Sequence, residues 1–398
     1  MQRETLVDRE LERALLHDSA IDRVRPFHIR VPQPVLDDLQ FRLARTRWTR
    51  AVPEDGWSHG TDPAYLRALV EYWLDDFDWR LQERLLNHIP QFRAHLGELD
   101  MHFAHVRADR PRAMPLLLLH GWPDSFVRYR SVAPLLAERG FNAVVPSLPG
   151  FPLTAALEDI SHTPLRRVAK LLYELMTDVL GYARFGVVGG DTGGAIAQIL
   201  ALDHPDSVIG IHLTDLGWHT AMTPPASVTR PERRYLKRMQ KQAMRDGGYA
   251  LVQATRPRSL APGLDDSPVG LASWIVDRFH AWSDGDLDER FGKDTLLANI
   301  MLYWTSHAMA TSAQLYYAEA QSPSLSIAER VDVPCAVALY PHDIGGIPPR
   351  LFAERTLAVR RWTEMRRGGH FAALEAPESF THDVVEFFRS LAPAGGLS

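Results

Sequence analysis

Short apolar segments alternate with helical segments along much of this chain, and that alternation constrains the fold more than any other feature. Strands are expected at 101–106, 114–119, 142–146, 185–188, 208–213 and, after a long interruption, 333–340. Helical segments fill the stretches between them, for example at 131–138 and 164–180. Buried strands joined by helices are typical of a parallel sheet that is covered on both faces. The pattern therefore predicts an α/β fold with a mostly parallel, doubly wound sheet.

The chain divides into four stretches that differ in the pattern of expected helices and strands. We interpret them as an N-terminal helical region (1–97), a first part of the core (98–217), a helical block (218–325) and a second part of the core (326–398). Asp62 and Pro63 predict the start of a helix over 63–77. Further helices are expected at 79–86, 195–202, 231–245, 269–286, 295–319 and 379–391. A helical block inserted late in such a sheet is typical of a lid over a site at the carboxyl ends of the strands.

Composition argues against several classes of function. The 398 residues include 44 Lys plus Arg and 49 Asp plus Glu, a formal net charge of -5, so nothing indicates a nucleic-acid partner. No apolar run approaches the roughly 20 residues that span a bilayer, and residues 1–23 lack the apolar core of a signal peptide. The single cysteine, Cys335, allows no internal disulfide and argues against a cysteine-based metal site. We expect a soluble, cytoplasmic protein without a membrane anchor.

The sharpest local motif is Gly189-Gly190-Asp191-Thr192-Gly193-Gly194, between the strand at 185–188 and the helix at 195–202. A candidate nucleophile flanked by small residues at a strand–turn–helix junction is typical of a nucleophile elbow. Glycines suit this turn because a β-carbon would clash where the chain reverses so tightly. An aspartate that only caps the helix is the alternative interpretation. A phosphate-binding loop is disfavoured because no Lys-Ser/Thr pair follows the glycines.

Two further motifs supply a candidate oxyanion hole and a candidate base. His120-Gly121-Trp122-Pro123 follows the strand at 114–119. In α/β hydrolases this loop provides one oxyanion N–H and the residue after the nucleophile provides the other, which here would be Trp122 and Thr192. Asp343 follows the strand at 333–340, and His370 precedes the last helix. The order Asp191, Asp343, His370 matches the nucleophile–acid–histidine order of these enzymes.

Together these motifs resemble those of epoxide hydrolases of the microsomal type, which add an N-terminal meander to the α/β-hydrolase fold. The resemblance runs from about Pro26 to Phe388. Besides the elbow, the Trp122 loop and the His370 loop, it rests on the segments 26–29, 79–92, 266–271 and 301–304.

The resemblance implies two tyrosines in the helical block, here called the cap, that hydrogen-bond the epoxide oxygen. By motif they fall on Tyr249 and Tyr317, with the adjacent Tyr316 as the alternative for the second. The resemblance also implies a small-molecule epoxide as substrate, a vicinal diol as product, and no metal or organic cofactor. Its N-terminal meander leads us to expect a homodimer.

The residue types suit this reaction. An aspartate, with a pKa of about 3.9, is ionised at neutral pH and can attack an sp³ carbon without first losing a proton. Tyr249 and Tyr317 would donate to the leaving epoxide oxygen. His370, oriented by Asp343, would then activate water against the ester formed on Asp191.

Four aromatic residues lie in or near motifs that are expected to line the substrate pocket: Phe126, Phe151, Trp304 and Tyr316. They favour an apolar epoxide, aryl epoxides included, although packing between cap and core would account for them equally well.

Two other functions stay open from the sequence. A haloalkane dehalogenase shares the fold and the aspartate nucleophile, but commonly has a halide-binding tryptophan directly after the nucleophile, where this chain has Thr192. A ligand-binding protein that has lost turnover is the second, and the complete set of catalytic residue types argues against it.

Overall fold

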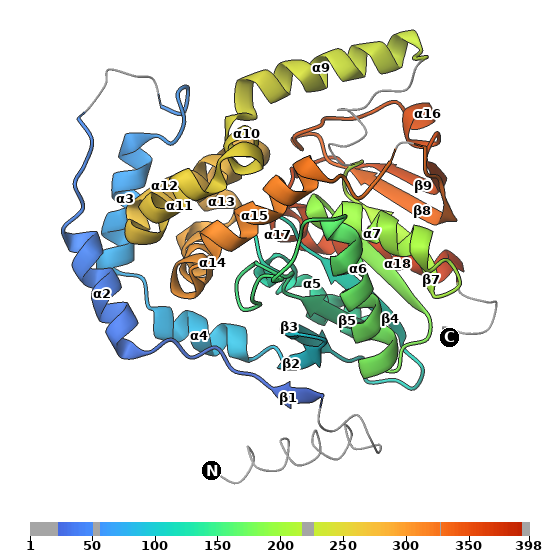
Figure 1. Cartoon of the computed structure of the whole chain (residues 1–398), viewed down its shortest axis with the longest axis horizontal. Coiled ribbons are helices and arrows are strands. Elements are labelled where there is room, and N and C mark those ends of the chain that lie inside the picture. The colour runs from blue at the N-terminus through green and yellow to red at the C-terminus, as the bar shows by residue number, and fades with distance from the viewer. Residues whose placement is uncertain (1–22, 51–55, 217–226, 327, 392–398) are drawn as a thin grey trace.

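A nine-stranded sheet forms the centre of the computed structural model, which describes residues 23–50, 56–216, 227–326 and 328–391 (Figure 1). The strand order is β1-β2-β3-β5-β4-β6-β7-β8-β9. The strands from β5 to β9 along this order are parallel, and β1, β2 and β3 are antiparallel additions at one edge. Their bounds are Val24–Pro26 (β1), Gln91–Leu96 (β2), Leu99–Val106 (β3), Met114–Leu119 (β4), Phe141–Pro146 (β5), Phe185–Gly189 (β6), Val208–Leu213 (β7), Val331–Leu339 (β8) and Leu357–Glu364 (β9). The predicted doubly wound, mostly parallel sheet is confirmed.

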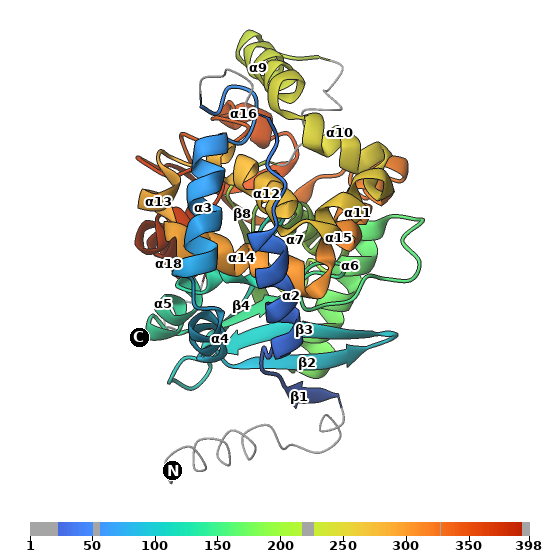
Figure 2. The same cartoon turned by 90° about the vertical axis from the view of Figure 1, so that its left-hand side faces the viewer.

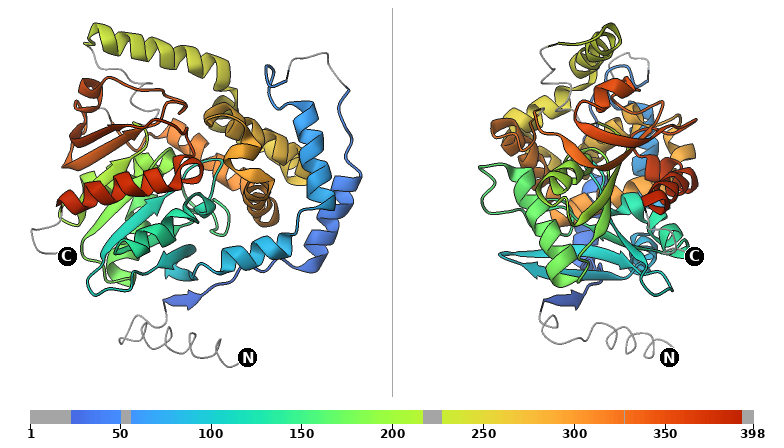
Figure 3. Two further views of the ribbon diagram at one scale, coloured as in Figure 1. Left: turned by 180° about the vertical axis from the view of Figure 1, so that it is seen from behind. Right: turned by 90° about the vertical axis from the view of Figure 1, so that its right-hand side faces the viewer.

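Helices cover both faces of this sheet. On one face lie α6 (Pro164–Glu174) and α7 (Thr192–Asp203), and on the other lie α5 (Val132–Glu138) and α18 (Pro377–Leu391), as Figures 1 and 3 show from opposite sides. The central strand β6 is buried along its whole length because both of its faces are covered. The predicted helix at 164–180 is α6 followed by a π-helical turn, Leu175–Val179.

The N-terminal region is not purely helical, contrary to the prediction. It contains α2 (Gln33–Ala44), α3 (Pro63–Asp75, capped by Asp62 as predicted) and α4 (Trp79–Asn87), but also β1 and β2. Strand β2 pairs with β3 as a hairpin, so the expected boundary at 97/98 falls in its turn. Strands with mixed polar and apolar residues give a weak sequence signal, and β2 is such a strand although most of its residues are buried. The edge strand β9, which was not predicted either, has the same mixed composition.

The cap consists of α9 (Arg230–Asp246), α10 (Gly248–Thr255), α11 (Pro257–Asp266), α12 (Pro268–Trp282), α13 (Leu287–Arg290), α14 (Gly292–Ser306) and α15 (Ala308–Gln321). The prediction of one helix over 295–319 is wrong, because His307 adopts a left-handed conformation (φ 51°) that ends α14 and starts α15. The helix predicted to reach 286 already ends at Trp282. The expected boundary at 217/218 and the N-terminal segment 1–22 lie outside the described residues.

The N-terminal helices pack against one side of the cap. Figure 2 shows α2 and α3 alongside α12 and α14. Arg42 of α2 donates to the Asp266 carboxylate (2.7 Å), and the hydroxyls of Tyr65 and Tyr72 donate to Asp288 and Asp294 (2.8 and 2.9 Å). No helix in the described ranges is both long enough and apolar enough to cross a membrane.

Candidate active site

Asp191 lies at the tight junction between β6 and α7, as the elbow motif predicts. Its backbone has φ 54° and ψ −132°, a conformation that non-glycine residues rarely adopt. A β-carbon on Gly121 would collide with the Asp191 carboxylate, and one on Gly193 would collide with the Leu119 carbonyl. The glycines therefore allow the elbow and the loop after β4 to approach each other closely.

One carboxylate oxygen of Asp191 is held by three donors. Oδ1 accepts from the backbone N–H of Trp122 (3.0 Å), the N–H of Thr192 (2.7 Å) and the Thr192 hydroxyl (3.0 Å). The structure thus brings the two predicted oxyanion residues together around the same atom. The N-terminus of α7 also favours negative charge at this position.

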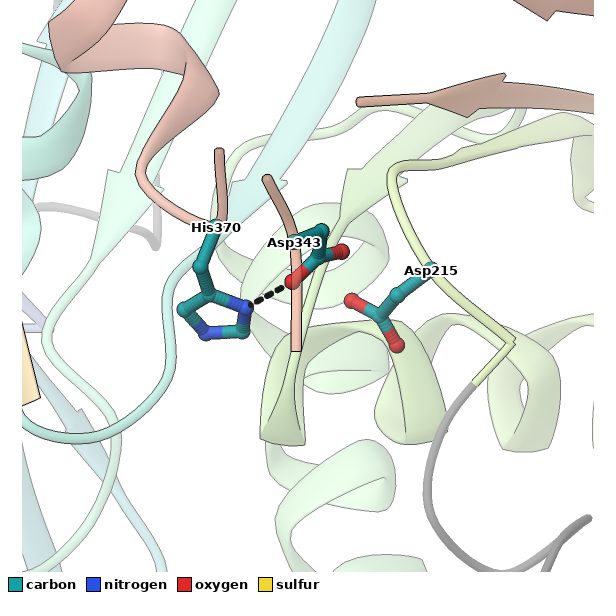
Figure 4. Close-up of side chains that lie close together, drawn as sticks. All are labelled: Asp215, Asp343 and His370. Carbon is teal, nitrogen blue, oxygen red and sulfur yellow. Dashed lines mark hydrogen bonds and ion pairs between the residues drawn. The ribbon is translucent and has the colours of Figure 1, made fainter. Parts of the chain in front are cut away.

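The second oxygen, Oδ2, faces His370. The His370 Nε2 atom lies 3.6 Å from Asp191 Oδ2 and has no hydrogen-bond partner among the described residues. The other ring nitrogen, Nδ1, lies 2.8 Å from Asp343 Oδ1, as Figure 4 shows. All three side chains are nearly buried, with exposed fractions of 3, 6 and 7% for His370, Asp191 and Asp343. The predicted order of three residues is therefore a spatial triad.

The surroundings of the triad shift the pKa values of Asp191 and His370. Burial alone would raise the pKa of Asp191 and lower that of His370, because each charged form loses hydration. The attraction between the two side chains and the backbone N–H donors of Thr192 and Trp122 lower the pKa of Asp191, and the charges of Asp343 and Asp191 raise the pKa of His370. Both shifts favour a proton on His370 beside an ionised Asp191.

Two cap tyrosines face the nucleophile, and the second is Tyr316. The Tyr249 ring stacks on the Trp122 indole (centroids 5.2 Å apart, interplanar angle 7°), and the Tyr316 ring meets both edge-on at 6.2 and 6.0 Å. Burial, followed by neighbouring charge that includes Asp191, raises the pKa of both tyrosines. Tyr317 is 41% exposed on the outer side of α15, which corrects the placement expected by motif.

The other three aromatic residues expected in the pocket have their ring contacts elsewhere. The Phe126 ring packs on His102 at 5.0 Å, and the Phe151 ring packs on His120 at 5.1 Å. Trp304 faces the N-terminal region, where the guanidinium of Arg42 lies 5.9 Å from its ring centre. These contacts favour the alternative of packing for the three side chains.

Trp282, which the sequence did not single out, borders the site. Its ring lies 5.1 Å from Tyr249 and 5.2 Å from His370. Its indole N–H and that of Trp122 have no hydrogen-bond partner in the part of the chain that the structure describes. Nothing in its local sequence distinguishes Trp282 from the other tryptophans.

A buried ion pair holds the catalytic loops together. Arg128, from the 3-10 helix η1 (Phe126–Tyr129), donates to the Asp124 carboxylate (2.5 Å) and to the His370 carbonyl oxygen. Asp124 in turn accepts from the Gly121 N–H (3.0 Å). Arg128 therefore links the oxyanion loop to the loop that carries the base.

Comparisons with known proteins identify the family of the chain. Residues 24–129 match the family described as "Epoxide hydrolase N terminus", and residues 114–252 match "alpha/beta hydrolase fold". Among solved structures, juvenile hormone epoxide hydrolase from Bombyx mori is similar with a TM-score of 0.84 at 28% identity, over 96% of each chain. The Aspergillus niger epoxide hydrolase has a TM-score of 0.80 at 28% identity, over 92% of this chain and 96% of that one.

Two relatives are more similar in sequence. A Stigmatella aurantiaca protein described as "Putative epoxide hydrolase" is 38% identical over 92% of this chain and 85% of its own length. Epoxide hydrolase 1 of Sus scrofa is 31% identical over 92% of this chain and 88% of its own length. On these matches, the chain belongs to the epoxide hydrolase family of the α/β-hydrolase fold.

Proposed function

We propose that this epoxide hydrolase opens an apolar epoxide by attack of Asp191, forms a hydroxyalkyl ester on that residue, and hydrolyses the ester to a vicinal diol. The observation that carries this mechanism is that the two carboxylate oxygens of Asp191 have different neighbours. Oδ1 has three donors at 2.7 to 3.0 Å, whereas Oδ2 has His370 Nε2 at 3.6 Å. Oδ2 is therefore the oxygen available to attack a carbon.

In the first step, an Oδ2–carbon bond forms while the epoxide C–O bond breaks. The breaking bond leaves negative charge on the epoxide oxygen, which takes a proton from Tyr249 or Tyr316. Assistance of this kind is typically worth about 10² to 10⁴ in rate. Because the two tyrosine rings are neighbours, one hydroxyl can donate to the oxygen while the other stabilises the resulting phenolate.

In the second step, His370 takes a proton from a water molecule that attacks the ester carbonyl carbon, while the carbonyl oxygen stays within the donors from Trp122 and Thr192. The bond from that carbon to Oδ2 then breaks, and the diol leaves with Oδ2 after taking the proton of the carboxylic acid formed on Asp191. Esterification removes the negative charge of Asp191, one of the charges that hold the proton on His370. The pKa of His370 falls as a result, so the imidazole gives its proton to the phenolate left by the first step and is neutral when a general base is needed. One oxyanion donor is typically worth about 10² to 10³ in rate.

The rings around the reacting oxygen favour apolar substrates. Trp122, Tyr249, Tyr316 and Trp282 surround the place where the epoxide would lie. The first three contact one another through ring faces or edges, and Trp282 contacts Tyr249. Aryl epoxides offer a further ring for such contacts, which prefer stacked or edge-to-face geometry.

A labelling experiment tests the covalent route. The wild-type protein, in excess over styrene oxide, would complete a single turnover in H₂¹⁸O. Attack by Asp191 transfers one of its own oxygens to the diol, so ¹⁸O should enter the peptide that holds Asp191 and the diol should stay unlabelled. Label in the diol and none in Asp191 would contradict the ester and indicate direct attack by water.

Haloalkane dehalogenation is a second candidate because the indole N–H groups of Trp122 and Trp282 are buried beside the nucleophile without a partner among the described residues. Indole N–H groups are donors that could bind a leaving halide. The same preparation would be assayed with 1-bromobutane. Bromide release at a rate comparable with diol formation would support the second activity, and release no faster than in buffer would exclude it.

The homodimer and the cytoplasmic location are also proposals. The N-terminal meander supports the former by resemblance, and the single buried cysteine suits a reducing compartment. Sedimentation of the protein at micromolar concentration tests the dimer, since a monomer mass would contradict it. Cell fractionation tests the location.

A further inference from the structure

Asp215 is a partly buried carboxylate beside the triad to which the mechanism above gives no role. It follows β7 directly, and Figure 4 shows it next to Asp343, on the side away from His370 in that view. One oxygen of Asp215, one oxygen of Asp343 and one ring nitrogen of His370 lie within 4.8 Å of one another. Its position at the carboxyl end of a central parallel strand places it on the same edge of the sheet as the catalytic residues.

Asp215 is bonded to the backbone of the nucleophile. Its Oδ2 accepts from the Asp191 N–H at 2.7 Å. That N–H belongs to the residue whose backbone is strained (φ 54°), so the bond helps to hold Asp191 in the one conformation that aims Oδ2 outward. A β-carbon on Gly190 would collide with Thr214 Oγ1 and would also lie close to this carboxylate (3.2 Å) and to Arg128 Nη2 (3.3 Å).

The surroundings of Asp215 couple it to His370 by charge. The groups that face it from neighbouring elements are Asp191, Asp343, His370, Tyr129, Tyr235 and, across Gly190, Arg128. Burial and the Asp343 charge raise the pKa of Asp215 above its usual value. A cavity of about 30 Å³, lined by Asp215, Asp343 and His370 among others, has room for about two water molecules that can solvate its ionised form.

We infer that Asp215 is a positioning residue for both chemical steps. Its carboxylate fixes the backbone of Asp191 for attack on the epoxide, and its negative charge beside Asp343 helps to hold the proton on His370 until the second step. This inference rests on the proposed covalent mechanism.

Two substitutions separate the two roles. Asp215→Asn keeps an oxygen that can accept from the Asp191 N–H but removes the charge, whereas Asp215→Ala removes both. Asp203→Asn, at the far end of α7, is the matched control for loss of one carboxylate charge, because Asp203 is paired with Arg166 outside the site. Rapid quenching followed by intact-mass spectrometry would measure ester formation and ester decay with styrene oxide between pH 5 and pH 9.

With Asp215→Asn, the rate of ester formation should stay within about threefold of wild type. The acid limb of ester decay, which is the fall of its rate toward low pH, should move to lower pH by about one unit. The direction follows because removing a nearby negative charge lowers the pKa of His370, so the base is neutral at lower pH. With Asp215→Ala, ester formation should also fall, by about tenfold, because the nucleophile is less well oriented. The Asp203→Asn profile should match wild type.

If the acid limb of ester decay lies at the same pH in Asp215→Asn as in wild type, the inference is wrong. The Asn variant is nearly isosteric and decides the matter alone if the alanine variant does not fold. Wild-type protein that gives diol without any ester would instead contradict the covalent mechanism, so the two failures are distinguishable.

Discussion

At the scale of the residue, the site depends on which way single side chains point. Tyr316 and Tyr317 are neighbours in sequence, and one residue of an α-helix turns the side chain by about 100°. The turn places the Tyr316 ring against Tyr249 and Trp122 and leaves Tyr317 41% exposed. A motif match with a one-residue ambiguity could not separate the two, because both are tyrosines and only the packing of α15 decides.

This placement gives a paired prediction. Tyr316→Phe should slow ester formation by about 10² because the departing oxygen loses one of its two hydroxyl donors. Tyr317→Phe should stay within about twofold of wild type, since its hydroxyl is on the outer side of α15. Single-turnover rates with styrene oxide would measure both, and equal losses in the two variants would contradict the assignment.

At the scale of the element, the sequence predicted apolar parallel strands well and strands of mixed composition poorly. Strand β4 is apolar on both faces and was expected at its observed bounds, 114–119. Strands β2 and β9 mix charged and apolar residues, so periodicity did not reveal them, although β2 is mostly buried and β9 is partly exposed along most of its length. The break between α14 and α15 was missed because His307 is neither glycine nor proline, the usual signals of a helix end.

The break at His307 allows a test of that conformation. His307→Gly should leave the free energy of unfolding unchanged or raise it by up to about 1 kcal/mol, because glycine adopts a left-handed conformation freely. His307→Val should lower it by about 1 to 2 kcal/mol, because a β-branched residue is strained there. Urea unfolding would measure both, and equal stability of the Gly and Val variants would show that the turn is not left-handed in solution.

At the scale of the whole molecule, contacts between distant parts of the chain complete the site. Arg128 and Asp124 connect the loop that holds Gly121 to His370, which lies far along the sequence. Both side chains are only 1% exposed. Arg42, Tyr65 and Tyr72 tie the N-terminal region to the cap. The chain order of nucleophile, acid and base could be predicted from motifs, whereas these links depend on tertiary packing that no local pattern encodes.

The buried ion pair gives a prediction at this scale. Arg128→Met should lower the free energy of unfolding by about 3 to 5 kcal/mol, because Asp124 becomes a buried charge without its partner. Adding Asp124→Asn should recover a large part of that loss, since the uncompensated charge is then removed and the Gly121 N–H keeps an acceptor. Denaturant unfolding of the single and double variants would measure this. A loss below about 1 kcal/mol in Arg128→Met would contradict the role assigned to the pair.

The covalent ester on Asp191 is the central claim, and trapping it is the most direct test. His370→Gln would be mixed with a panel of aryl and alkyl epoxides and followed by intact-mass spectrometry and peptide mapping. Without the base, ester hydrolysis should stall, and the protein should gain the mass of one epoxide on the peptide that holds Asp191. An unmodified His370→Gln protein with every epoxide that the wild-type enzyme converts to diol would contradict the account.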